Sequence, residues 1–284
     1  MTIQWYPGHM AKAKREISER LKIIDIVLEI RDSRIPRASG NPDLAALIGG
    51  KTRIVVLNKA DLADPVATEG WRAALSRDEA LTVEADSRSV AGLRQVRAEA
   101  SAAAARLSER LAARGRRPRP ARMLVVGVPN VGKSTIINRL AQRGAARTAD
   151  RPGVTRGQQW VTVGKSLELL DTPGLLWPRF DDPEVGVKLA VTAAIDDRLT
   201  DAEELCNWLV DFLMRRYPLE LSSYCGLDSL PSTPGELIDR IGRLRGCLQS
   251  GDRVDSRRAA EVILRDFRDG KIGRISLEHP GDLQ

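Results

Sequence analysis

Residues 127–135 read GVPNVGKST, a stretch whose residue types and spacing suit the binding of phosphate groups. It matches the pattern G-x-x-x-x-G-K-[ST], in which glycines let the backbone curl so that its N–H groups point at phosphate oxygens. Lys133 would place a positive charge beside the β and γ phosphates, and the Ser134 hydroxyl would ligate Mg²⁺. The nucleotide contacts predicted here are Pro129, Asn130, Val131, Gly132, Lys133, Ser134 and Thr135.

Two further motifs downstream would complete a site for phosphate chemistry. Residues 152–157 read PGVTRG, and residues 167–174 read LELLDTPG. In GTP hydrolases a mobile threonine, here Thr155, closes over Mg²⁺ and the γ-phosphate, and the Gly174 amide would contact that phosphate. The metal ligands expected are Ser134, Thr155 and, through water, Asp171.

A guanine base could be recognised by LNKAD, residues 57–61. Asp61 can accept hydrogen bonds from guanine N1–H and the N2 amine, whereas adenine offers neither donor. Because such charge-assisted bonds contribute roughly 1.5–3 kcal/mol each, the motif favours GTP and GDP over adenine nucleotides. The rest of the loop around the base would be Asn58, Lys59 and Ala60.

A last loop, VEADSRS at residues 83–89, follows a short predicted strand. Loops at this position cover the guanine oxygen with a backbone amide, which we assign to Ser87. The usual Ser-Ala pair is replaced here by Asp86-Ser87, a change that a backbone contact tolerates.

The order of these motifs is unusual, because the base-binding motif precedes the phosphate loop. No second N-K-x-D follows Gly174. Two interpretations are open: NKAD is accidental and an ATPase begins near residue 122, or the domain is circularly permuted. Permutation is physically reasonable, since contacts between strands and helices hold a parallel sheet whatever the position of the chain ends. It requires a joint between the old termini.

The elements that would position these motifs predict an α/β P-loop GTPase domain with a mostly parallel sheet and flanking helices. Apolar runs at residues 53–57, 122–126 and 167–170 are typical of strands, and residues 134–142 have helical spacing. The joint would be an Ala-rich helix at 99–113 and a basic linker, 114–121. We predict a permuted GTP-binding domain over residues 1–177.

The remaining residues, 178–284, predict a small all-helical domain, in which the arginines of the last helix could contact RNA or lie on a solvated surface. Residues 187–217 have helical apolar spacing, and turn-forming residues cluster at 231–236 and 250–253. In the last helical stretch, 254–271, one face carries Val254, Ala260, Ile263 or Leu264, and Phe267. A hydrophobic core is the simplest interpretation of that face.

Charge and composition limit the class of protein. Residues 1–174 hold 30 Lys/Arg and 18 Asp/Glu, an excess of +12, while residues 175–284 hold 15 and 20, or −5, out of a net +7. A basic field favours a polyanionic partner, although ordinary surface arginines would give the same net charge.

The three widely spaced cysteines are typical of reduced cytoplasmic thiols. No apolar run approaches the roughly 18 residues of a membrane span.

WYPGHM (residues 5–10), NKAD, GVPNVGKST, RPGVTRGQQW and ELLDTPGLLWPRF, in this order, resemble the YlqF/RbgA family of circularly permuted GTPases over essentially the whole chain. The resemblance implies an assembly factor of the large ribosomal subunit that binds rRNA or the precursor particle. It also implies slow GTP hydrolysis that the particle stimulates. Potassium is implied through Asn130, which matches the phosphate-loop asparagine of potassium-dependent relatives.

Hydrolysis needs a group that orients the attacking water. Many GTPases use a glutamine after D-T-x-G, but this chain has Leu175. Only two histidines are present, His9 in WYPGHM and His279 in the C-terminal tail, which we expect at the surface. Spacing alone favours a structural or RNA-contacting role for His9. The resemblance implies that it is catalytic.

Other functions stay open at this point. One is a nucleotide-gated signalling or membrane-recruitment GTPase that does not act on the ribosome, and another is an RNA-binding scaffold with a structural nucleotide. The five arginines at 114–122 could contact RNA phosphates or be a solvated joint. We expect a monomer with GTP or GDP and Mg²⁺, and no DNA or membrane partner.

Overall fold

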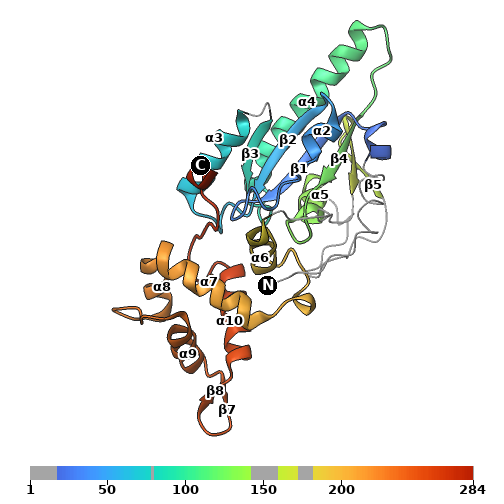
Figure 1. The fold of residues 1–284 in the computed structure, drawn as a ribbon. Helices are drawn as coiled ribbons and strands as arrows, with labels where there is room; N and C mark the ends of the chain where they lie inside the picture. Colours follow the sequence, from blue (N-terminus) through green and yellow to red (C-terminus); the bar gives the residue numbers. More distant parts are fainter. Residues whose placement is uncertain (1–17, 78–79, 142–158, 172–181, 284) are drawn as a thin grey trace. The chain divides into compact units, whose positions relative to one another are not determined.

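The computed structural model describes residues 18–77, 80–141, 159–171 and 182–283. These residues form two compact units (Figure 1). The first, here the nucleotide domain, contains the described residues up to 171 together with 278–283, and the second, the helical unit, contains residues 182–277. Each unit is described by itself. Within the described residues, no helix combines the length and the apolarity that crossing a membrane requires.

The nucleotide domain is built on a six-stranded sheet of order β3-β2-β1-β4-β6-β5. Every neighbouring pair is parallel except β5 and β6. This confirms the predicted α/β class with a mostly parallel sheet. The strands are β1 (Ile26–Asp32), β2 (Thr52–Asn58), β3 (Leu81–Ala85), β4 (Ala121–Val126), β5 (Gln159–Val163) and β6 (Leu167–Asp171).

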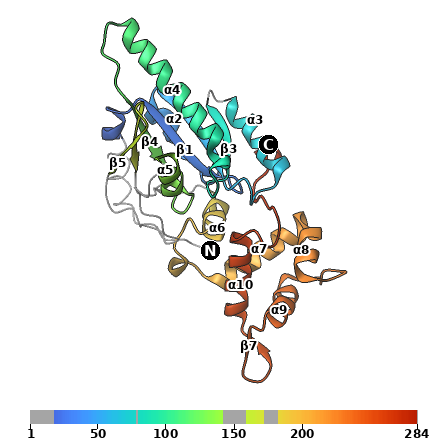
Figure 2. The ribbon, with the colours of Figure 1, turned by 180° about the vertical axis from the view of Figure 1, so that it is seen from behind.

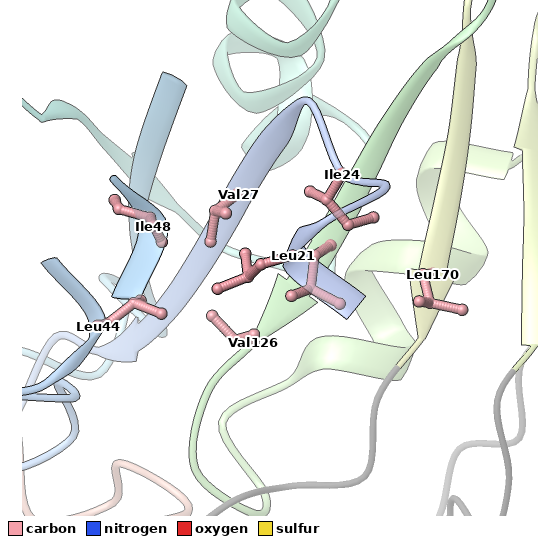
Figure 3. Packing of buried hydrophobic residues seen from close by; sticks show 8 residues of the cluster. Leu21, Ile24, Val27, Leu44, Ile48, Val126 and Leu170 are labelled. Atoms are coloured by element: carbon pink, nitrogen blue, oxygen red, sulfur yellow. The ribbon is translucent and has the colours of Figure 1, made fainter. Parts of the chain in front are cut away.

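Helices cover both faces of this sheet (Figures 1 and 2). On one face, Leu44 and Ile48 of α2 pack with Val27 of β1 and Leu124 of β4, as part of the cluster in Figure 3. On the other face α4 and α5 meet, where the Arg97 guanidinium donates to backbone carbonyls at the end of α5. The helices are α2 (Leu44–Ile48), α3 (Pro65–Ser76), α4 (Arg94–Ala113) and α5 (Lys133–Ala141).

Helix α4 is the predicted joint between the permuted halves. Its buried residues all lie at or before Ala104, and beyond that point the helix extends past the sheet (Figures 1 and 2). The linker then returns the chain to β4. Arg119 forms a bidentate ion pair with Asp25 (2.7 and 2.9 Å), and the N–H of Arg122 donates to the same carboxylate (2.9 Å). The end of the linker therefore has a structural role, while Arg114, Arg116 and Arg117 are exposed.

Strand β1 lies between β2 and β4 but was not among the predicted strands. Two charged residues, Glu29 and Arg31, interrupt its apolar pattern. Glu29 is buried and accepts from Arg31 (3.0 Å) and from Arg53 of β2 (2.6 Å). Burial opposes ionisation of Glu29, but these two guanidinium groups outweigh it and lower the pKa of the carboxyl. Buried charges of this kind are stable only when paired.

The helical unit has its helices at α6 (Pro183–Val191), α7 (Ala202–Arg216), α8 (Pro218–Cys225), α9 (Pro234–Leu244) and α10 (Ser256–Arg268). Asp182, Asp201 and Asp255 cap three of them by accepting backbone N–H bonds. The predicted helical stretch 187–217 is two helices, since Ala193 adopts φ 62° between them. The unit also contains a short antiparallel hairpin, β7 (Leu248–Gln249) and β8 (Arg253–Val254), so it is not all-helical. The turn-forming SGDR produces this hairpin.

The predicted apolar face near the end of the chain is confirmed as core. Phe267 and Ile263 of α10 are buried, and Val254, in β8, is buried against Gly242 of α9. The tail differs from the predicted domain 178–284, because residues 278–283 belong to the nucleotide domain. The carboxylate of Glu278 accepts from the N–H groups of Arg37 and Ala38, and its carbonyl accepts from Trp71. His279 is accordingly half-buried.

Candidate nucleotide-binding site

The predicted phosphate loop connects the end of β4 to the start of α5, at the edge of the sheet where the parallel strands end. Gly127 has φ 155°, and a Cβ at this position would lie 2.4 Å from the carbonyl oxygen of Ile30. Only glycine can therefore bring the loop this close to β1. Asn130 adopts the left-handed conformation (φ 55°), which asparagine tolerates better than most residues.

Lys133 is the first residue of α5 and is 7% exposed. Its ammonium group donates to the carbonyls of Gly127 (3.1 Å) and Val128 (2.9 Å), so it lies across the mouth of its own loop. These acceptors are neutral. A phosphate oxygen bound in the loop would be a stronger, charged acceptor for the same donor. The start of α5 also has backbone N–H groups and a positive dipole end, which favour an anion.

Asn58 joins three loops that are far apart in the sequence. Its Nδ2 donates to the carbonyl of Val131 (2.7 Å) and to Oγ of Ser87 (3.1 Å), and its Oδ1 accepts from the Ser87 N–H (3.1 Å). Gly132 permits the approach, because a Cβ there would lie 2.4 Å from Asn58 Nδ2. The base motif and the phosphate loop are thus parts of one site, which supports permutation and not an accidental NKAD.

Lys59, the second residue of the base motif, is held in an unfavourable backbone conformation. Its φ is 61°, and a non-glycine residue adopts this region at a cost of about 1–2 kcal/mol. Asp32, at the end of β1, accepts from Lys59 Nζ (3.0 Å) and also from Arg34 (2.9 and 2.8 Å). The N–H of Ser33 donates to the Asn58 carbonyl (2.8 Å), so the residues after β1 support this loop twice.

The charges around Lys59 are strongly coupled. Asp32 is 2% exposed; its burial opposes ionisation, but Arg34 and Lys59 outweigh burial and hold the pKa of Asp32 well below its usual range. Burial lowers the pKa of Lys59, and the Asp32 carboxylate opposes that effect. The Asp32 carboxylate and the Lys59 ammonium therefore each favour the charged form of the other.

Asp61, the predicted guanine acceptor, lies at the edge of the site with its side chain 21% exposed. Its loop is tied to β3 by the Ala60 N–H, which donates to the Ala85 carbonyl (3.1 Å). The Asp61 carboxylate pairs with Arg88. Burial raises the pKa of Asp61, the Asp86 carboxylate raises it further, and Arg88 opposes both. A carboxylate in this position can accept two parallel N–H bonds, as guanine would supply.

Ser87, predicted to cover the guanine oxygen with its backbone amide, donates that N–H to Asn58 Oδ1 (3.1 Å). Its contact with the base stays a prediction. The N–H of the next residue, Arg88, donates to Asp86 (2.9 Å). Ser87 thus joins its loop to the base motif, and the next residue, Arg88, lies beside Asp61.

The predicted metal ligands are only partly described. Ser134 lies in the first turn of α5. Asp171 ends β6, which pairs with β4 in the register Leu124↔Leu170, so its backbone lies beside the start of the phosphate loop. Hydroxyl and carboxylate oxygens are the donors that Mg²⁺ prefers, and this placement fits them. The side chain of Asp171 and the residues His9, Thr155 and Gly174 lie outside the described part.

Sequence reasoning missed three residues of this site: Asp32, Arg34 and Arg88. The signal that could have found the first two is the charged sequence RDSR, residues 31–34, at the end of a strand that leads to the same sheet edge as NKAD. Arg88 had no such signal. Its contact with Asp61 depends on how the loops at the ends of β2 and β3 fold together.

Comparisons with known proteins agree with this geometry. A model of the 50S ribosome-binding GTPase family matches residues 122–223, which begin at the phosphate-loop strand and leave out the base motif before it. Ribosome biogenesis GTPase A of Bacillus pumilus is 46% identical over 280 residues, 99% of each chain. The protein of that name from Thermotoga maritima is 30% identical over 281 residues, 99% of this chain and 96% of the relative.

Solved structures are also similar. The GDP-bound structure of TM YlqF has a TM-score of 0.67 at 26% identity and covers 94% of this chain and 100% of that one. The crystal structure of GNP-bound YlqF from T. maritima has a TM-score of 0.63 at 27% identity and covers 95% and 98%. The fold is therefore shared along nearly the whole length of both chains.

Proposed function

Because this chain belongs to the ribosome biogenesis GTPase A family, we propose that it binds GTP and hydrolyses it to GDP and phosphate as a switch in assembly of the large ribosomal subunit. The observation that carries the proposal is the Asn58 joint, since it places a guanine-selective loop against a phosphate loop. One nucleotide can then contact both.

In this function each loop has a distinct task. Asp61 accepts the guanine N1–H and N2 amine, while Asn58, Lys59 and Ala60 hold that loop in place. The backbone of residues 129–135 surrounds the α and β phosphates, and Lys133 moves its bonds from loop carbonyls to phosphate oxygens. Gly174 contacts the γ-phosphate of GTP. Hydrolysis removes this contact, which makes the site a switch.

Mg²⁺ would be held by Ser134, by Thr155 and, through water, by Asp171. When bound, it neutralises charge on the β and γ phosphates. A potassium ion beside Asn130 would add positive charge in the same region. Thr155 would close over the γ-phosphate when GTP is present.

Leu175 cannot orient a water molecule, so we propose that His9 takes this task once the ribosomal particle is bound. A neutral imidazole can accept a proton from water or orient it. The variant His9→Ala should keep GTP affinity nearly unchanged, while turnover stimulated by the particle falls by at least roughly tenfold, about 1.4 kcal/mol. Full stimulated turnover in that variant would assign the water to another group.

The partners proposed are rRNA and the large subunit or its precursor, in the cytoplasm, with the protein acting as a monomer that is slow alone and faster on the particle. The basic excess of residues 1–174 supports a polyanionic partner.

Co-sedimentation with large ribosomal subunits tests the proposal, with a non-hydrolysable GTP analogue compared with GDP. We expect the protein to pellet with the subunits in the analogue and to remain largely in the supernatant with GDP. Equal pelleting with both nucleotides would contradict the switch. No pelleting with either would favour a signalling GTPase that does not act on the ribosome.

A further inference from the structure

The tail at residues 278–283 is the last part of the chain, yet it packs in the nucleotide domain and reaches the loop that follows β1. Glu278 is 5% exposed. Its carboxylate accepts from the N–H of Arg37 (2.7 Å) and from that of Ala38 (3.2 and 3.3 Å), about 240 positions earlier in the sequence. Ionised acceptors of backbone N–H groups form the stronger class of hydrogen bond.

The tail is fixed at this place by contacts of its own backbone. The Trp71 indole N–H donates to the Glu278 carbonyl (3.1 Å), and Trp71 is buried against the β2 residues Val55 and Leu57. Pro280 packs on Gly70, where a Cβ would lie 2.8 Å from Pro280 Cγ. The position of the Glu278 carboxylate is therefore set by α3 and not only by the loop it binds.

A continuous series of contacts runs from this loop to the base motif. Ser39 Oγ donates to the Ile35 carbonyl (2.6 Å) and accepts from the Asp32 N–H (3.0 Å). These contacts hold Asp32 at the point where its carboxylate accepts from Lys59 (3.0 Å). Lys59 needs this support, because its backbone lies in the left-handed region. In the turn that Glu278 binds, residues 35–39, Arg37 is exposed and the other four residues are buried.

We propose that Glu278 is a positioning residue for guanine recognition, acting through the turn at residues 35–39 and Asp32 on Lys59. The inference rests on the proposed binding of guanine nucleotides. The residue before it, Leu277, is the last of the helical unit. The chain of that unit therefore continues directly into a residue that supports the base end of the site.

The test compares Glu278→Gln with a matched control, Glu69→Gln, which removes the same charge from the exposed face of α3. In Glu278→Gln a neutral amide oxygen replaces the charged acceptor of the two N–H groups, and the NH₂ that replaces the second oxygen cannot accept. We expect GDP affinity, measured with a fluorescent GDP, to fall about tenfold in Glu278→Gln and to stay within about twofold of wild type in Glu69→Gln.

Competition by inorganic pyrophosphate separates positioning from general damage. Pyrophosphate occupies only the phosphate loop, so its affinity should not change in Glu278→Gln. A general loss of folded structure would lower the affinity for GDP and for pyrophosphate by the same factor. That result, or wild-type GDP affinity in Glu278→Gln, would overturn the inference.

A double variant tests the route. If Glu278 acts through Asp32, adding Glu278→Gln to Asp32→Asn should cause little further loss of GDP affinity. Two full, additive losses would contradict that route. If Glu278→Gln does not fold, Glu278→Asp serves in its place, since the shorter acid cannot reach both N–H groups and should weaken GDP but not pyrophosphate. Failure of the wild-type protein to bind GDP would instead contradict the proposed function.

Discussion

At the base end of the nucleotide site, buried side chains make the structural contacts, whereas at the phosphate end the backbone makes most of them. Asn58 and Asp32 support the base motif through hydrogen bonds and ion pairs to side chains and backbone groups. The phosphate loop is shaped by Gly127 and Gly132, and its one buried charge, Lys133, bonds to carbonyls of its own loop.

The difference explains how the motif order can be rotated. Contacts made by side chains across three loops do not depend on which loop comes first in the chain, so β1 to β3 can precede the phosphate loop. The old termini are then joined by α4 and the linker, whose end is fixed by Arg119 and Asp25. A backbone loop such as 127–135, by contrast, must be continuous.

The largest effect is expected from breaking the base end at Asn58. In Asn58→Ala the Val131 carbonyl and the Ser87 N–H lose a buried partner, and each unsatisfied group costs about 1–3 kcal/mol. We therefore expect the free energy of unfolding, measured in urea, to fall by about 2–4 kcal/mol, and GDP binding to weaken. Asn207→Ala is the control, because Asn207 is exposed and donates only to Glu203 on its own helix among the contacts described. Equal losses in the two variants would contradict the joint.

A smaller and pH-dependent effect is expected at Asp32. Its pKa is lowered in the folded protein from an ordinary value of 3.8, so its ionised contacts stabilise the fold above that value and are lost as pH falls toward the folded pKa. The free energy of unfolding of wild type should exceed that of Asp32→Asn at about pH 7, and the gap should narrow below about pH 4. The exposed Asp228→Asn should show no such gap. A gap that widens with acid would contradict the ion pairs.

The smallest expected effect concerns the linker, and it separates two groups of arginines. Changing Arg114, Arg116 and Arg117 to Gln should flatten the salt dependence of binding to large-subunit rRNA by about two to three units of slope, if they contact phosphates. Arg119→Gln should instead lower stability by about 1 kcal/mol or less, since its partner Asp25 is partly exposed. An unchanged slope in the triple variant would leave the linker only its structural role.

The phosphate end could be predicted from sequence because its chemistry is local. Nine consecutive residues, 127–135, specify the loop, and the strand before it and the helix after it follow from apolar spacing. Asn58 and Asp61 could be recognised for the same reason. Sequence also predicted the core face of α10 correctly, where Phe267 and Ile263 recur at helical spacing.

The contacts that support the base end could not be predicted in this way. Glu29 and Arg31 break the apolar pattern of β1, and only the fold shows that the two charges are buried together. Glu278 contacts Arg37 across 241 positions, a pairing for which no local pattern exists. The bond from the Ser87 N–H to Asn58 could not be predicted either, because it depends on how the loops after β2 and β3 fold together.

The central claim is that NKAD recognises a guanine base although it precedes the phosphate loop, and Asp61→Asn tests it most directly. The measurement is competition of GDP, xanthosine diphosphate and ADP for the site in wild type and variant. Wild type should bind GDP far better than the other two, and Asp61→Asn should bind xanthosine diphosphate better than GDP, because an amide can donate to the 2-oxo group that replaces the amine. Equal binding of ADP and GDP by wild type, or an unchanged preference for GDP in the variant, would contradict the account.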